Sequence, residues 1–119
     1  MQKTSNYTQG EWQNQVEMAI TVCNADGIIQ EMNDYAKQVF DKDGDKSIIG
    51  TNVLDCHPEP ARSKLLNMLM CGISNTYTIE KKGKRKIIQQ IPRFRSGEFA
   101  GLVEISFYIP EQMPHFIRS

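Results

Sequence analysis

The chain has 119 residues, enough for one domain with a single core, because a domain of this size buries roughly two thirds of the surface that its unfolded chain exposes. Its 14 lysines and arginines balance its 14 aspartates and glutamates, so net charge favours neither nucleic acid nor an anionic membrane as a partner. Residues 1–10 lack the apolar core of a signal peptide and the three cysteines lack a Cys-x-x-Cys spacing, so we expect a cytosolic protein with reduced thiols.

The first predicted element is a short helix over residues 9–17. Thr8 and Glu11 fit a capping box, in which each side chain bonds a backbone amide of the other residue. Trp12 and Val16 are four residues apart and would share one face of this helix. A helix this short is marginal alone and needs a surface to cover its apolar face. We therefore expect Trp12 and Val16 to form part of a homodimer contact.

A hairpin and a second short helix follow. Residues 18–23 and 28–32 are rich in strand formers, and the turn-forming sequence of residues 24–27 separates them. Asn33 then fits the cap of a helix over residues 34–40.

The sequence between Asp55 and Met70 predicts the longest helix. Pro58 suits a first helical turn, where its missing N–H costs nothing, and Gly72 suits the end of the helix. We expect this helix to begin within two residues of Pro58. Three extended segments come next: residues 77–81, 86–94 and 99–109. This order predicts an α+β fold, in which a five-stranded antiparallel sheet carries short helices and one longer helix on one face.

Two stretches of this sequence are similar to the PAS sensor domain: CNADGIIQEMNDYAKQVF and IIGTNVLDCHPEPARSKL. In that family, a turn like the one at residues 24–27 joins the first two strands, an asparagine such as Asn33 follows the second strand, and a Gly-x-Asn sequence such as residues 50–52 precedes the long helix. The resemblance implies a PAS fold over residues 11–110, between a poorly ordered N-terminus (1–10) and a C-terminal tail (111–119).

The resemblance also implies a function. PAS domains sense small molecules or pair proteins, and their pocket lies between the sheet and the long helix. We expect a small-molecule sensor that signals through protein contact; the alternative is a pure interaction module whose cavity is filled by its own side chains. An enzyme is not expected, because the two histidines, His57 and His115, are far apart and no nucleophile–base arrangement has support beyond the adjacency of Cys56 and His57.

Known PAS cofactors can be compared with individual positions. The flavin-binding branch carries a reactive cysteine directly after Gly-x-Asn, where this chain has Val53, so a flavin photocycle is not expected. The oxygen-sensing haem kinases share the Pro-Glu-Pro-x-Arg-Ser string of residues 58–63, but their haem histidine corresponds to Leu65. Haem would therefore require His57 as the metal ligand.

The alternative for His57 is a helix cap or a hydrogen bond to a neighbouring loop. We expect Cys56 and Cys71 to be small buried residues, and the flexible methionine side chains suit either a ligand pocket or an ordinary core. The candidate cofactor-binding residues are Met32, Cys56, His57, Leu65, Met68 and Leu69.

Overall fold

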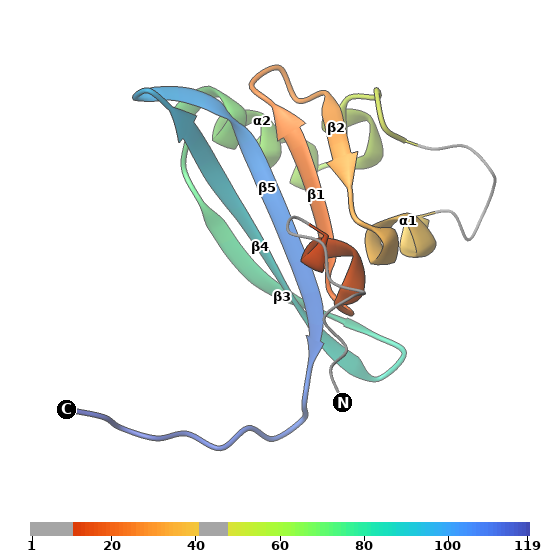
Figure 1. The fold of residues 1–119 in the computed structure, drawn as a ribbon, viewed down its shortest axis with the longest axis vertical. Coiled ribbons are helices and arrows are strands. Elements are labelled where there is room, and N and C mark those ends of the chain that lie inside the picture. Colours follow the sequence, from red (N-terminus) through yellow and green to blue (C-terminus); the bar gives the residue numbers. More distant parts are fainter. Residues whose placement is uncertain (1–10, 41–47) are drawn as a thin grey trace, which may run out of the picture.

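The computed structural model describes residues 11–40 and 48–119. Its five strands form one antiparallel sheet in the order β2-β1-β5-β4-β3, with α1 and α2 on one face (Figure 1). The predicted fold class is confirmed. The elements are η2 (Trp12–Gln15), β1 (Ala19–Asn24), β2 (Ile29–Met32), α1 (Asp34–Phe40), η4 (Val53–Cys56), α2 (Ala61–Cys71), β3 (Asn75–Lys81), β4 (Lys84–Arg95) and β5 (Glu98–Ile109).

The β1–β2 hairpin forms where the turn sequence predicts it. The side-chain oxygen of Asn24 accepts hydrogen bonds from the backbone amides of Asp26 and Ile28, at 3.0 and 2.9 Å. Gly27 has a φ of 87°, a conformation that residues with a side chain rarely adopt. Local side-chain and backbone preferences therefore account for this turn.

Asn33 joins three segments of the chain. Its Oδ1 accepts from the backbone amide of Ala36, which is the predicted helix cap, and from that of Ile20, both at 3.0 Å. Its Nδ2 donates to the backbone carbonyls of Gln13 (2.6 Å) and Met18 (2.8 Å). Asn33 is only 5% exposed, so all four hydrogen bonds form away from bulk water.

The predicted helix over residues 9–17 is wrong in its C-terminal half. The structure has only the single 3₁₀ turn η2 there, and Val16 is already extended, with φ −118° and ψ 148°. Asn33 binds the carbonyl of Gln13, which a continuous helix would leave to its own amides, and the carbonyl of Met18 just after the predicted helix, so these tertiary contacts outcompete a marginal helix. Trp12 and Val16 are exposed, at 48% and 37%, and share no helical face. The predicted capping box at Thr8 lies outside the described residues.

The predicted start of the long helix is also wrong. α2 begins at Ala61, three residues after Pro58, because Pro60 disfavours helical geometry at the residue before it. The carboxylate of Glu59 still caps the helix, accepting from the amide of Ser63 at 3.1 Å. The predicted end is confirmed: Gly72 takes the left-handed conformation there and donates to the carbonyl of Met68.

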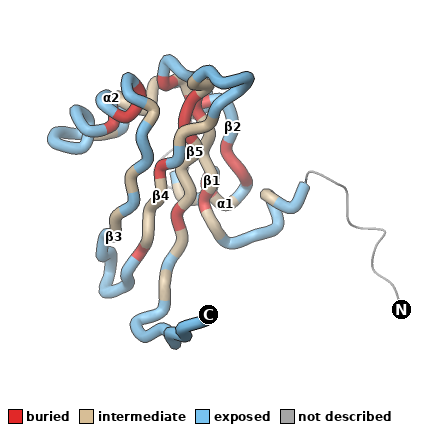
Figure 2. Tube along the Cα trace, turned by 90° about the vertical axis from the view of Figure 1, so that its left-hand side faces the viewer, coloured by how far each residue is buried: buried red, intermediate tan, exposed pale blue. Residues whose placement is uncertain are grey.

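The core lies where the helices cover the sheet (Figure 2). Two groups of buried residues fill it, one beneath α2 and one beneath α1. The first contains Cys23, Leu65, Met68, Leu69 and Leu102, and the second contains Ala19, Ile29, Met32 and Ala36. The half-buried Val53 of η4 packs against both groups, so η4 closes the space between the two helices.

Candidate functional site

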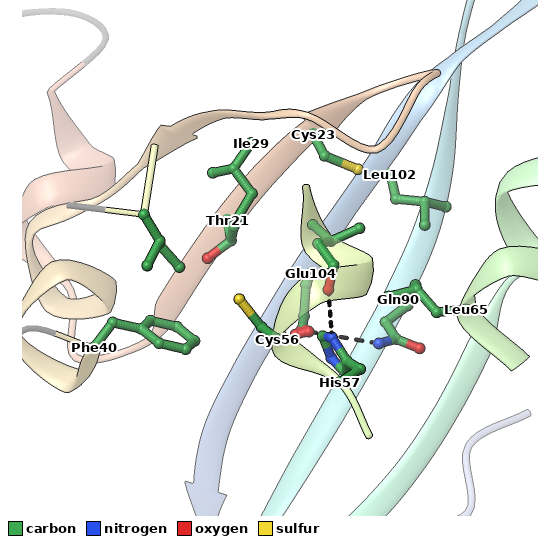
Figure 3. A pocket seen from close by; sticks show the side chains of 12 residues that line it. Thr21, Cys23, Ile29, Phe40, Cys56, His57, Leu65, Gln90, Leu102 and Glu104 are labelled. Carbon is green, nitrogen blue, oxygen red and sulfur yellow. Dashed lines mark hydrogen bonds between the residues drawn. The ribbon is translucent and has the colours of Figure 1, made fainter. Parts of the chain in front are cut away.

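A cavity of about 120 Å³ lies on the helix-bearing face of the sheet. Strands β1, β2, β4 and β5 supply one side of its wall, and α1, η4 and α2 supply the other (Figure 3). Its lining residues are Thr21, Cys23, Ile29, Phe40, Ile48, Val53, Cys56, His57, Leu65, Gln90, Leu102 and Glu104. Most of this wall is apolar, and its polar side chains are few.

The sheet register brings two of these polar side chains together. Gln90 of β4 is paired directly with Glu104 of β5, and the Gln90 Nε2 donates to the Glu104 Oε1 over 3.5 Å. Asn75 of β3, opposite Gln90 in the next pair of strands, donates its Nδ2 to the Gln90 Oε1 at 3.2 Å. Asn75 therefore orients the Gln90 amide so that its NH₂ group faces Glu104.

His57 approaches the same place from η4. Its Nδ1 is 2.7 Å from the carbonyl oxygen of Val53, as the dashed line to the ring in Figure 3 shows. A carbonyl can only accept, so Nδ1 carries a proton and donates this hydrogen bond. This contact corresponds to the hydrogen-bonding alternative that the sequence leaves open for His57, and it fixes the ring orientation beside Glu104.

Burial raises the pKa of Glu104 above its ordinary value of 4.5. Protein atoms surround its carboxyl group on nearly all sides, although part of the side chain remains accessible. His57, the hydrogen bond from Gln90 and the charge of Lys86 each lower this pKa, but they do not offset desolvation. The carboxylate form of Glu104 is therefore destabilised in the folded protein.

We predict that Glu104→Gln stabilises the protein at neutral pH. Because the folded pKa is raised, the native state binds more protons than the unfolded chain between pH 4.5 and the raised value, so wild-type stability falls as the pH rises through that window. The amide has no charge to bury. At about pH 8 its melting temperature should exceed that of the wild type by several degrees, as expected for roughly 1 kcal/mol. At about pH 4 the two proteins should have the same melting temperature. A difference in melting temperature that is the same at both pH values would contradict the prediction.

Comparisons with known proteins identify solved structures that share this fold. No family model and no curated protein matches the sequence. Among solved structures, the PAS domain of BvgS from Bordetella pertussis has a TM-score of 0.62 at 18% identity, with 85% of this chain and 83% of that chain covered. The chain has the PAS fold.

Two further structures share the PAS fold with this chain. A sensory box sensor histidine kinase from Vibrio cholerae has a TM-score of 0.61 at 19% identity, with 86% of this chain and 89% of that chain covered. The Aer2 receptor from Vibrio cholerae, described as a dual PAS-heme oxygen sensor, has a TM-score of 0.54 at 18% identity, with coverage of 78% and 95%. These are PAS sensor domains of signalling proteins. No helix in the described part of this chain is long and apolar enough to cross a membrane.

Three of the six candidate residues line the cavity: Cys56, His57 and Leu65. The other three belong to the core beside it. Met68 is completely buried and Leu69 is 8% exposed beneath α2, and Met32 is 8% exposed beneath α1. None of these three contributes to the lining, so the methionines act as core residues in this structure.

The expected burial of Cys56 and Cys71 is wrong. Both are exposed, and the buried cysteine is Cys23. Cys56 lies at the end of η4, and Cys71 lies in the last turn of α2, where its thiol is 3.4 Å from the Asn67 Oδ1. Burial raises the pKa of the thiols of Cys23 and Cys56, so neither is an activated thiolate.

Three polar residues that line the cavity were not predicted from the sequence: Thr21, Gln90 and Glu104. A signal was present for Glu104, since it interrupts a run of apolar residues in the last strand. Leu102 and Glu104 face the cavity, so Val103, which lies between them in the strand, faces the opposite side of the sheet. Periodicity identified the strand without identifying which side carries the helices.

Haem does not fit the cavity as it stands. Pockets for ligands of drug size measure about 300–1,000 Å³, several times the 120 Å³ of this cavity. The Nε2 of His57 has suitable chemistry for a metal, but the described residues contain no group of three or more potential metal ligands around it. The structure therefore gives no support to His57 as a haem ligand.

Proposed function

We propose that this chain is a cytosolic PAS sensor that binds a small molecule and signals by changing its contacts with a protein partner. The observation that carries the proposal is the cavity beneath the helices, with an apolar wall and a convergent polar group at Gln90, Glu104 and His57. Such a combination is typical of small-molecule sites, where apolar surface supplies affinity and a few polar groups select the ligand. The sensor proteins that share the fold support the same role.

A pure interaction module is the alternative. A cavity closed by its own side chains would favour this alternative, because buried space without a ligand costs stability. Catalysis is not part of the proposal, since no hydrogen-bonded nucleophile and base occur together in the described cavity lining.

The test is a search for a ligand in the purified protein. The released small-molecule fraction of the denatured protein is analysed by mass spectrometry, and a fragment library is screened by the melting temperature. We expect a molecule near one equivalent, or fragments that raise the melting temperature of the wild type. Thr21→Leu, which places a larger apolar side chain in the cavity, should weaken both signals.

Thr76→Leu is the matched control, because Thr76 is exposed on β3 and lies outside the cavity. It should behave as the wild type does. A wild-type protein that carries no molecule and responds to no fragment would support the interaction module instead.

The proposed output surface includes Trp12 and Val16. Both side chains are exposed immediately before β1, and a large exposed Trp ring is a common centre of a protein interface. If this surface forms a homodimer, Trp12→Ala should weaken the dimer by tenfold or more, measured by sedimentation over a range of concentrations.

Phe116→Ala is the control for the dimer, since Phe116 is another exposed aromatic residue, in the tail after β5. It should leave the dimer unchanged. A wild type that sediments as a monomer at about 1 mM would eliminate this surface as a homodimer contact.

A further inference from the structure

The polar groups that face the cavity present mainly hydrogen-bond acceptors. Glu104 offers carboxylate oxygens, while Nδ1 of His57 is already hydrogen-bonded to the carbonyl of Val53. The NH₂ group of Gln90 is directed to Glu104, and its carbonyl oxygen is occupied by Asn75. The cavity therefore calls for a ligand that donates hydrogen bonds.

The protein supplies no cation to Glu104 within salt-bridge distance in the part of the chain that the structure describes. Two basic side chains lower its pKa without forming a salt bridge: His57, which lines the cavity, and Lys86, which does not and whose Nζ lies 5.3 Å from the ring centroid of Tyr108. Arg93 contacts the carbonyl of Cys23 and the side chain of Gln30 instead. Glu104 is thus a largely enclosed acidic group that forms no salt bridge within the described residues.

We propose that the ligand of this cavity is a small organic cation, an ammonium or amidinium group on a short apolar body, with Glu104 as its counter-ion. The inference rests on the proposed sensor function and specifies its ligand. A charged donor forms hydrogen bonds to a carboxylate that are roughly twice as strong as those of a neutral donor. An anionic ligand would place two negative charges in one poorly hydrated space.

The cavity size sets the apolar part of the ligand. An engineered apolar cavity of about 150 Å³ binds benzene, so the 120 Å³ measured here suits a body of about six carbon atoms. The wall opposite the polar group consists of aliphatic and aromatic side chains, including Ile29, Phe40 and Val53. A cationic head at Glu104 would leave such a body against this wall.

Three probes of matched shape test the charge: benzylamine, benzyl alcohol and benzoate. Each is titrated at about pH 7.5 and equal ionic strength into isotope-labelled wild-type protein, and binding is read from the amide signals of Thr21, Gln90 and Leu102. Benzylamine, protonated at this pH, should bind at least tenfold more tightly than benzyl alcohol, and benzoate should bind more weakly than either. The binding of benzylamine should also weaken as the pH falls, because Glu104 then takes up a proton.

Glu104→Gln separates the charge from the shape of the site. It should remove the preference for benzylamine and leave the affinity for benzyl alcohol within about twofold. Glu98→Gln is the control, because Glu98 lies on the same strand but is exposed and outside the cavity. It should keep the wild-type preference.

Two results would overturn the inference: benzyl alcohol binding as tightly as benzylamine, or a benzylamine preference that survives in Glu104→Gln. In both cases the cavity still binds small molecules and the sensor proposal stands. Failure of all three probes to shift the cavity amides also overturns it. The sensor proposal is then decided separately by the released-molecule and fragment experiments.

Discussion

Gly101→Ala should leave most of the protein unfolded at 25 °C. Gly101 lies in β5 opposite Asn24 of β1, and a Cβ atom built there would be 2.0 Å from the carbonyl oxygen of Cys23. This oxygen belongs to the backbone of the adjacent strand, so relief requires the two central strands to separate. The φ of Gly101 is also 137°, which an alanine rarely adopts. We expect a loss of about 4 kcal/mol or more, measured by urea unfolding or, if the variant is already unfolded, by circular dichroism.

Gly97→Ala separates the two causes of this loss. Gly97 lies in the β4–β5 turn with a φ of 82°, but no atom lies within 4 Å of a Cβ built there. It should therefore show the conformational cost alone, about 1 kcal/mol. If Gly97→Ala and Gly101→Ala destabilise the protein equally, the backbone contact with β1 is not the reason for the glycine.

Asn33→Ala should destabilise the protein by roughly 3 kcal/mol. The substitution removes a helix cap from α1 and leaves the partly buried carbonyls of Gln13 and Met18 and the amide of Ile20 without their side-chain partner. Each unsatisfied buried group costs on the order of 1–3 kcal/mol, reduced where water enters the opened space. Chemical unfolding measures the loss, and hydrogen exchange should show the earliest opening in residues 13–20.

Asn33→Asp and Asn14→Ala test this interpretation. The aspartate retains the acceptor that caps α1 but cannot donate to the two carbonyls, so it should remain strongly destabilising. Asn14 also accepts a hydrogen bond at the start of α1, from the amide of Asp34, but this contact is exposed, and its loss should cost below about 1 kcal/mol. Equal effects of Asn33→Ala and Asn14→Ala would show that capping alone explains the role of Asn33.

Only part of the candidate site could be predicted from the sequence. His57, Cys56 and Leu65 were predicted because they lie near the start of the long helix, which the sequence located to within three residues. Gln90 and Glu104 come from two strands whose register places them side by side, and register depends on every pair along the strands. Fourteen residues separate them in sequence, and neither is in a local motif that marks it as a site residue.

The sequence alone determined the elements whose causes are local. The turn at Asn24, the cap at Asn33 and the end of α2 at Gly72 follow from side-chain and backbone chemistry within a few residues. The order of these elements then predicted an antiparallel sheet with helices on one face, because few arrangements cover one face of such a sheet, and the resemblance of two stretches to a known family implied the PAS fold.

Only the tertiary structure decided the features that depend on distant partners. The bonds from Asn33 to Gln13 and Met18 replaced a marginal helix with a single turn, and the fold enclosed Glu104 without a salt bridge in the described residues. A short helix has too little stability of its own to resist such contacts. The charge environment of a carboxyl group likewise exists only after the strands and helices have excluded water from it.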